Sequence, residues 1–249
     1  MQELFGEFLG TFILILLGNG VVANVNLEKT YSKGAGWIVI TAGWGMAVFV
    51  AVFATADLSG AHLNPAVTIG LAAAGLFQWA KVIPFILAQV AGAMMGALTV
   101  FLFFKNHFDI TTAPGAKKAC FCTGPAIRNF RSNFFSEMVG TFVLVFAVLM
   151  ITLPQLEYHS FSGSSKVGLG SLGALPVALV VFSIGMSLGG TTGYAINPAR
   201  DFGPRLVHWL LPLKSKDNTD WAYSWIPIVG PVTGAVIAAL LYKVVVNLV

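Results

Sequence analysis

Six stretches of the chain are apolar for about the length that crosses a membrane, and this feature limits the fold more than any other. The hydrocarbon core of a bilayer is about 30 Å thick, so a crossing helix needs about 20 mostly apolar residues. Because backbone groups exposed to lipid must be hydrogen-bonded within their own segment, we expect each stretch to be a helix. The predicted crossings are approximately Leu4–Val25, Gly36–Ala56, Val82–Phe104, Phe134–Leu153, Ser171–Gly189 and Trp225–Val246.

Two further apolar segments are only about half as long as a crossing helix. They run from Pro65 to Gln78 and from Pro198 to Leu211. Their length predicts helices that enter the membrane without crossing it. Irregular backbone at membrane depth persists only where protein or water satisfies its peptide groups. A pair of such elements therefore indicates an aqueous path or a substrate cavity.

The composition excludes several other classes of protein. The chain is 57% hydrophobic and 10% charged, against about 45–50% and about 25% in a soluble globular domain. Its net charge of +4 is too small and too scattered for a nucleic-acid surface. Its cysteines, Cys120 and Cys122, are one residue apart, so they cannot supply four zinc ligands or a long-range disulfide, and we expect free thiols. We expect no metal, no cofactor and no enzymatic activity.

The sequence contains an internal repeat. Residues 7–12 (EFLGTF) are echoed by residues 137–142 (EMVGTF), and the triplet at 64–66 is repeated at 197–199. The distance from Glu to Asn is 57 residues in the first copy and 60 in the second. Similar order and spacing indicate duplication. We expect one domain, residues 1–249, made of repeats at about 1–104 and 132–249 that are joined by loop 105–131.

Three crossings in each half give the two copies opposite orientations in the membrane. The short helices then enter from opposite faces, and their first residues can meet near the midplane. The predicted fold is an all-α membrane protein with six transmembrane helices and two re-entrant half-helices in an inverted repeat.

The two Asn-Pro-Ala triplets are typical helix starts, because Asn is a preferred N-cap and Pro fits the first helical position. Where two helix starts face each other, two positive dipole ends of about half an elementary charge converge and repel cations. Each Asn side chain also offers N–H donors to a passing water or hydroxyl oxygen. The residues assigned to this meeting point are Asn64, Pro65, Ala66, Asn197, Pro198 and Ala199.

Around these triplets the sequence resembles the major intrinsic protein family, which comprises the aquaporins and glycerol facilitators. The resemblance is carried by residues 59–68 (SGAHLNPAVT) and 193–204 (GYAINPARDFGP) and extends over nearly the whole chain. It implies one pore per subunit and a homotetramer. The glycerol facilitator branch is favoured by Asp201, Arg205, Phe101 and the pair Pro227-Ile228.

The resemblance also implies a selectivity filter made of Trp44, Gly185, Tyr194 and Arg200. An arginine at membrane depth is costly, so Arg200 is expected to face water. Water-selective members tend to have His at the position of Gly185, and the absence of a side chain there predicts a wider opening. Many glycerol facilitators have Phe at the position of Tyr194. The extra hydroxyl either narrows the opening or adds a hydrogen bond.

Glu7 and Glu137 are ionisable groups inside predicted crossings and so are functional candidates. One interpretation is a proton relay. We favour the other, in which each carboxylate accepts N–H bonds from the re-entrant loop of its own half and turns the loop carbonyls toward the pore. The carbonyls expected to line the pore are those of Gly60, Ala61, His62, Thr192, Gly193 and Tyr194.

The sequence thus predicts a passive channel for glycerol and related small uncharged solutes, with some water, that excludes ions and protons. The alternatives are a water-selective aquaporin and a coupled secondary transporter, since transporters also use inverted repeats and broken helices. The expected partners are the solutes, membrane lipid and further copies of the chain, without nucleic acid.

The expected location is a bacterial plasma membrane, with both termini in the cytoplasm as the family resemblance implies. The loop charges contradict the usual excess of Lys and Arg on the cytoplasmic side. With this orientation the inner segments carry Lys81, Lys166 and Lys243, whereas the outer ones carry Lys29, Lys33, Lys105, Lys117, Lys118, Arg128, Arg131, Arg205, Lys214 and Lys216.

Overall fold

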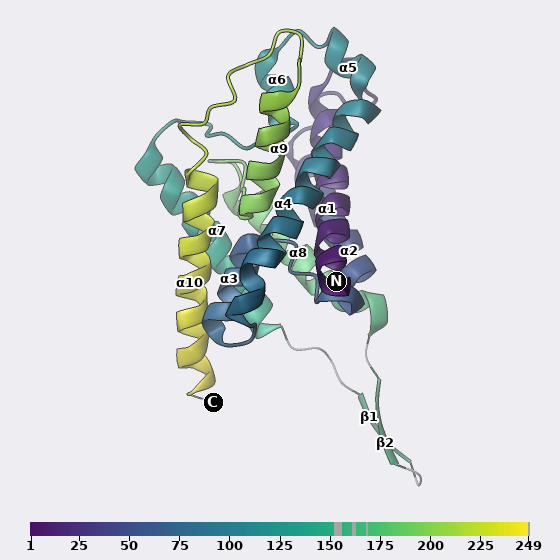
Figure 1. Ribbon diagram of the computed structural model, residues 1–249, viewed down its shortest axis with the longest axis vertical. Helices are drawn as coiled ribbons and strands as arrows, with labels where there is room; N and C mark the ends of the chain where they lie inside the picture. The colour runs from purple at the N-terminus through teal and green to yellow at the C-terminus, as the bar shows by residue number, and fades with distance from the viewer. Residues whose placement is uncertain (152–155, 161–162, 168, 249) are drawn as a thin grey trace.

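The computed structural model describes residues 1–151, 156–160, 163–167 and 169–248, with the backbone alone described for 156–160 and 163–167. Six helices among these residues are long and apolar enough to cross a membrane (Figure 1). They are α1 (Gln2–Asn26), α2 (Trp37–Ser59), α4 (Trp79–Phe103), α7 (Phe130–Met150), α8 (Leu175–Leu188) with the 3₁₀ turn before it, and α10 (Ile226–Val246). Each overlaps one predicted crossing, and the multi-pass membrane fold is confirmed. The end of the fourth predicted crossing, residues 152 and 153, lies outside the described residues.

The two predicted half-helices are α3 (Pro65–Ala74) and α9 (Pro198–Leu210). Each begins at a proline, directly after an asparagine in an extended conformation. The side-chain oxygen of Asn64 accepts a bond from the Ala66 N–H at 2.8 Å, so the capping chemistry expected from the sequence is present. Helix α3 ends four residues before the predicted Gln78, because Gly75 takes a left-handed conformation (φ +87°) that terminates a helix.

Close helix packing within each repeat depends on glycine. A Cβ on Gly92 of α4 would overlap the Phe8 carbonyl of α1, and one on Gly96 would lie 2.8 Å from the Phe12 carbonyl oxygen. In the second repeat, a Cβ on Gly234 of α10 would likewise overlap the Met138 carbonyl of α7. Gly92 and Gly96 thus form the face through which α4 packs closely on α1, and the α7–α10 pair repeats the arrangement of α1 and α4.

The connecting segments contain structure that the sequence analysis did not predict. Loop 105–131 carries two short helices, α5 (Lys105–Ile110) and α6 (Pro114–Ala119). Between α7 and α8 lie strands β1 (Leu156–Ser160) and β2 (Gly163–Val167), which pair antiparallel in a hairpin that projects from the helices (Figure 1). The predicted crossing at 171–189 begins with a 3₁₀ turn (Gly170–Ala174) instead of an α-helix.

Both chain ends lie toward the end of the bundle from which the hairpin projects, while α5 and α6 lie at the opposite end (Figure 1). The outer faces of the crossing helices expose large apolar side chains, such as Leu87 at 65% and Phe103 at 78%. Such exposure is costly in water but suits a surface in contact with lipid acyl chains.

Candidate functional site

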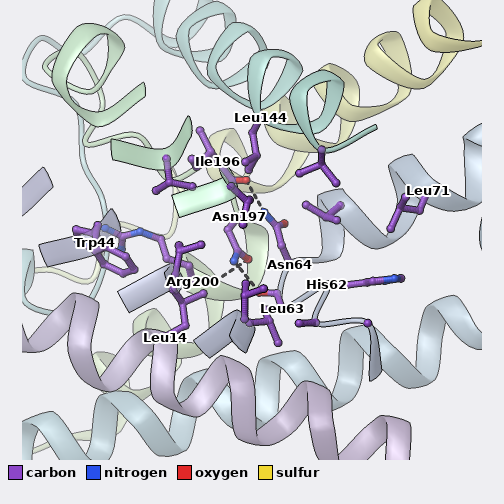
Figure 2. Close-up of a pocket in the computed structure, with 18 of the residues that line it drawn as sticks. Leu14, Trp44, His62, Leu63, Asn64, Leu71, Leu144, Ile196, Asn197 and Arg200 are labelled. Carbon is purple, nitrogen blue, oxygen red and sulfur yellow. Dashed lines mark hydrogen bonds between the residues drawn. The ribbon is translucent and has the colours of Figure 1, made fainter. Parts of the chain in front are cut away.

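The starts of α3 and α9 meet inside the helix bundle. The side-chain amide of Asn64 donates to the Ile196 carbonyl at 2.8 Å, and that of Asn197 donates to the Leu63 carbonyl at 2.8 Å (Figure 2). Each amide therefore uses one N–H to bind the loop that precedes the opposite half-helix. Since a side-chain amide has two N–H donors, one remains on each Asn for a solute.

The loops that lead into the half-helices have matching backbone conformations. Left-handed φ values occur at three equivalent positions before each Asn. Four of these six residues are not glycine, and in them this conformation costs on the order of 1 kcal/mol or more. Both loops therefore need external support. The left-handed residues are Gly60 (+82°), Ala61 (+50°) and Leu63 (+53°) in the first loop, and Gly193 (+76°), Tyr194 (+35°) and Ile196 (+43°) in the second.

Glu7 supplies that support to the first loop. Its fully buried carboxylate accepts the backbone N–H groups of His62 at 2.9 Å and Leu63 at 2.7 Å. It also accepts the Gln89 side-chain amide at 2.7 Å and the Ser59 hydroxyl at 2.7 Å. Glu7 thus connects α1 to the loop, to α4 and to the end of α2.

Glu137 occupies the equivalent position in the second repeat. Its carboxylate, 2% exposed, accepts the backbone N–H groups of Ala195 at 2.9 Å and Ile196 at 2.8 Å. Ala195 and Ile196 correspond to His62 and Leu63, so the two carboxylates make the same backbone contacts. Among the described residues, neither carboxylate lines either of the two cavities that lie next to the loops.

Two cavities lie along the axis of the molecule and share three lining residues. One, of about 220 Å³, contains Asn64 and Asn197 and has apolar walls that include Leu14, Leu71 and Leu144 (Figure 2). The other, of about 280 Å³, lies toward α6 and is lined by Val22, Asn26 and residues 122–126, among others. Trp44, Tyr194 and Arg200 line both cavities and therefore surround the point where the two cavities meet, which we call the constriction.

The constriction contains buried polar atoms that have no hydrogen-bond partner in the described structure. These are the Trp44 indole nitrogen, the Tyr194 hydroxyl and one terminal nitrogen of Arg200. The Arg200 guanidinium carbon lies 4.2 Å from the centre of the Trp44 ring, in cation–π geometry. Buried polar groups in native proteins are almost always satisfied. An oxygen-bearing solute at this point would satisfy these atoms.

Gly185, a predicted member of the selectivity filter, packs against the ring of Tyr194. Among the described residues, it does not line either cavity, because the phenol of Tyr194 covers it. A Cβ on Gly185 would lie 2.8 Å from the Tyr194 ring carbon that bears the hydroxyl and 2.9 Å from the Thr41 methyl carbon. The Tyr194 phenol therefore occupies the space beside Gly185, and the effect of the absent side chain on the width of the opening stays a prediction.

The predicted pore-lining carbonyl residues divide between the two cavities. Gly60, Ala61 and His62 line the first, and Gly193 lines the second. Thr192 lines neither cavity in the part of the chain described. The carbonyls of Leu63 and Ile196 accept the Asn side-chain amides across the repeat axis. These contacts were not predicted from the sequence. The pairing of loops across the axis is a tertiary feature without a local sequence signal.

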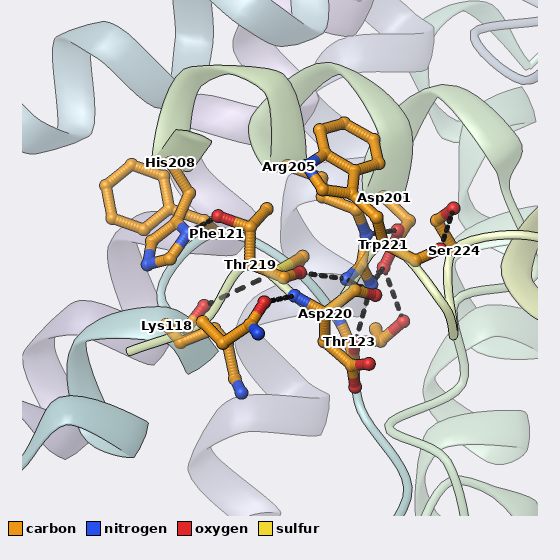
Figure 3. A network of polar contacts seen from close by, with 12 residues as sticks. Lys118, Phe121, Thr123, Asp201, Arg205, His208, Thr219, Asp220, Trp221 and Ser224 are labelled. Atoms are coloured by element: carbon orange, nitrogen blue, oxygen red, sulfur yellow. Dashed lines mark hydrogen bonds and ion pairs between the residues drawn. The ribbon is translucent and has the colours of Figure 1, made fainter. Parts of the chain in front are cut away.

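A buried ion pair fixes the loops around the second cavity. Arg205 and Asp201, both fully buried on α9, are paired with a nitrogen–oxygen distance of 2.7 Å. The Asp201 carboxylate accepts the Thr123 N–H at 2.8 Å and its hydroxyl at 2.6 Å, while the Arg205 guanidinium donates to the carbonyls of Thr123, Thr219 and Asp220 (Figure 3). This cluster ties loops 105–131 and 211–225 to the half-helix that carries Arg200.

Comparison with known proteins agrees with this geometry. The model of the major intrinsic protein family matches residues 1–242. The glycerol uptake facilitator protein of Streptococcus pneumoniae is 55% identical over 98% of this chain and 99% of its own. The probable glycerol uptake facilitator protein of Thermotoga maritima is 51% identical over 98% of this chain and 99% of its own.

A solved structure shows the same architecture. The X-ray structure of the aquaglyceroporin from Plasmodium falciparum aligns with a TM-score of 0.83 and 33% identity, over 99% of this chain and 97% of that one. The alignment spans the six crossings and both half-helices, so the similarity concerns the whole architecture. The chain belongs to the major intrinsic protein family.

Proposed function

We propose that the chain is a passive membrane channel that conducts glycerol and similar small uncharged solutes, with some water, and excludes ions and protons. The observation that carries the proposal is the meeting of two helix starts, joined by reciprocal Asn64 and Asn197 contacts, in the first of two adjoining cavities. The glycerol uptake facilitators at 51–55% identity over almost the full chain support glycerol as the solute.

Exclusion of cations follows from the charges that converge on the path. The first residues of α3 and α9 direct two positive dipole ends toward the two asparagines. Arg200, 6% exposed, adds a full positive charge at the constriction. A hydronium or sodium ion therefore meets positive potential twice, whereas an uncharged solute is not repelled.

Passage of a polyol requires a path with one polar and one apolar side. The first cavity is lined by loop residues and asparagine amides together with the apolar side chains of Leu14, Val48 and Leu144. A polyol has hydroxyl groups that bind the polar side and carbon atoms that pack against the apolar side. We assign the carbonyl-bearing loops, the two asparagines and Arg200 to solute contact, and Glu7 and Glu137 to support of the loops.

The Tyr194 phenol, which lines both cavities and packs against Gly185, favours one second candidate, a water-dominant channel. Purified protein in liposomes distinguishes the two by stopped-flow light scattering in osmotic gradients of glycerol and of an impermeant sugar. We expect glycerol flux that is linear in concentration and independent of a proton gradient. Water flow without glycerol flow would support the water-dominant channel, and saturable uptake coupled to a gradient would indicate a transporter.

A matched pair of variants shows whether the flux passes through the cavities. Leu144→Trp introduces a bulky ring into the first cavity, so it should block both glycerol and water. Leu102→Trp makes the same change on the lipid-facing surface, where the side chain is 62% exposed, and should conduct normally. Equal flux through both variants would mean that the solute takes another route.

The remaining assignments complete the proposal. Exposed apolar surface on the crossing helices suits both lipid and neighbouring subunits, and we assign a homotetramer in a bacterial plasma membrane with cytoplasmic termini. Light scattering of the detergent-solubilised protein measures the subunit number. Protease accessibility of a tag at the C-terminus, in right-side-out vesicles, tests the orientation.

A further inference from the structure

We propose that His208 links the half-helix α9 to the two loops at the α5 and α6 end of the bundle, and that protonation of its ring releases these loops and lowers the flux. The effect on flux rests on the proposed channel function. The release of the loops does not depend on that function and is measured separately.

His208 contacts both loops from α9. It is fully buried near the last turn of this half-helix, outside the six crossing helices. Its Nδ1 lies 2.9 Å from the Thr219 hydroxyl oxygen, and its ring packs on that of Phe121, with 5.5 Å between centroids (Figure 3). Thr219 belongs to loop 211–225 and Phe121 to loop 105–131. The imidazole thus holds the two loops against the same helix.

The site accommodates a neutral ring better than a charged one. The Nε2 atom of His208 is buried and has no hydrogen-bond partner in the part of the chain that the structure describes. A protonated imidazole carries an N–H on both nitrogens. Protonation would therefore bury a charge and also leave one buried donor unpaired. Both changes are unfavourable in a site from which water is excluded.

The charged groups that face His208 are mostly positive. Lys118 faces it from α6, and Lys216 faces it from the loop after α9. Arg205 lies one turn earlier on α9 itself. The carboxylate of Asp217 also faces the ring, but it is already paired with Lys118 at 2.6 Å. A proton on His208 would thus add a fourth positive charge to this cluster.

The other ionisable groups of these segments do not offset that charge. Asp201 is paired with Arg205, and Asp220 is paired with Arg128. The thiols on either side of Phe121 are neutral in acid, because burial raises the pKa of both. Helices α4 and α10 also pack on α9 but carry their ionisable side chains near the end that holds the chain termini. These side chains are Lys81, Tyr242 and Lys243.

Acid should therefore shift the loops toward a displaced state. Burial beside three cations lowers the pKa of His208 to about 4, from the value of 6.5 for a free imidazole. The neutral ring stabilises the packed loops fully above pH 6.5, and this contribution is lost progressively as the pH falls toward 4. Between pH 7 and pH 5, the equilibrium should move about 20-fold toward the displaced loops, because the exposed imidazole takes up a proton that the buried one refuses.

Displacement of loop 105–131 would reach the solute path directly. Residues 122–126 follow Phe121 and form part of the wall of the second cavity, which has a volume of about 280 Å³. A cavity of this size is obstructed when its wall moves by the width of one side chain. We expect the permeabilities to glycerol and water to fall together at pH 5 and to recover when the pH is restored.

Hydrogen–deuterium exchange of the full chain in detergent tests the release of the loops. The amides of residues 120–123 are hydrogen-bonded in the packed state. After correction for the intrinsic effect of pH, they should exchange about 20-fold faster at pH 5 than at pH 7 in wild type. In His208→Asn, whose amide can bond Thr219 but does not titrate, the two rates should be equal. His208→Phe, which keeps a ring against Phe121, gives the same comparison if the first variant does not fold.

The matched control is His107→Asn. His107 is a partly buried histidine on α5, at the same end of the molecule, and its Nδ1 donates to the Glu28 carbonyl at 2.9 Å. This variant should keep the full acid response. Stopped-flow permeabilities of the same proteins in liposomes measure the flux: wild type and His107→Asn should lose permeability at pH 5, and His208→Asn should not.

The outcomes separate this inference from the proposed function. Wild-type exchange that does not rise between pH 7 and pH 5 would overturn the role of His208 without any variant. An equal rise in His208→Asn would assign the response to another group and overturn it as well. A rise that this variant abolishes, with wild-type flux unchanged at pH 5, would overturn the effect on the path. Absence of glycerol flux at pH 7 would overturn the proposed function, while the exchange rates would still decide whether His208 holds the loops.

Discussion

Removal of the charge on Glu137 should disable the channel without touching the solute path. In Glu137→Gln, a carboxylate that binds the N–H groups of Ala195 and Ile196 at 2.9 and 2.8 Å becomes an amide with a single oxygen acceptor. That oxygen can satisfy one backbone donor. The amide N–H₂ then faces the other donor, which is left buried and unpaired.

The magnitude follows from these two bonds. Leaving one buried N–H unpaired costs about 1–3 kcal/mol, and hydrogen bonds to a charged acceptor are stronger than those to a neutral one. We therefore expect the braced loop to lose about 2 kcal/mol, or roughly 30-fold in its equilibrium with displaced conformations. The loop carries Tyr194 and leads directly into Asn197, so its displacement blocks the constriction.

Stopped-flow glycerol and water permeabilities and the midpoint of thermal unfolding in detergent measure this effect. The matched control is Glu3→Gln, because within the described part of the chain Glu3 forms an exposed ion pair with Lys81 at 3.0 Å and no other ion pair. Such pairs contribute about 0–1 kcal/mol. Glu137→Gln should lower both permeabilities and the midpoint. If its flux and midpoint match those of Glu3→Gln, the carboxylate does not hold the loop.

Three further predictions concern the second half of the path. Arg200→Val should admit protons, which a pH-sensitive dye inside the vesicles reports; a dye signal equal to that of wild type would remove the charge-barrier role of Arg200. Asp201→Ala should lower the free energy of unfolding by about 3–5 kcal/mol, because it leaves the buried Arg205 guanidinium without its carboxylate partner. Chemical denaturation measures this loss, and an unchanged free energy of unfolding would mean that the ion pair does not stabilise the fold. Burial raises the pKa of the Cys122 thiol to about 12, so its alkylation should be slow at pH 8 and accelerate as the pH rises toward that value; fast reaction at pH 8 would mean an exposed thiolate.

The local features of this fold could be predicted from the sequence. Apolar length alone located the crossings, and an Asn-Pro pair located the start of each half-helix, because capping depends on neighbouring residues. The repeated Glu predicted a carboxylate near each re-entrant loop. In the structure, Glu7 and Glu137 contact equivalent N–H groups, those of Leu63 and Ile196 among them.

Features that depend on packing between distant residues could not be predicted. The packing of Tyr194 against Gly185, Gly189 and Trp37 joins the loop before α9 to α8 and α2, and no local pattern signals that contact. The interpretation of Gly185 therefore rested on its missing side chain alone, without the contact that the Tyr194 ring makes with it. The hairpin between α7 and α8 was also missed, because it belongs to a polar connection where apolar periodicity gives no guidance.

The basic residues in the loops at the α5 and α6 end have structural partners that a count of charges cannot reveal. Lys117 is buried and donates to the Lys214 carbonyl at 2.6 Å, and burial lowers its pKa. Lys118 pairs with Asp217 at 2.6 Å, and Arg128 pairs with Asp220. These contacts fasten loop 105–131 to loop 211–225. They give the charge excess at this end a structural role, which the positive-inside rule does not take into account.

The two repeats share a backbone but differ where selectivity is decided. Three residues before each Asn stand Ala61 and Tyr194, and three residues after each stand Val67 and Arg200. Both members of each pair line the first cavity, at equivalent places in loops with the same left-handed conformations. The first repeat thus leaves its side of the path wide and apolar, and the second adds a phenol and a guanidinium. Duplication explains the supports that both halves need, while the narrow point lies to one side of the Asn–Asn centre because only one copy acquired large polar side chains.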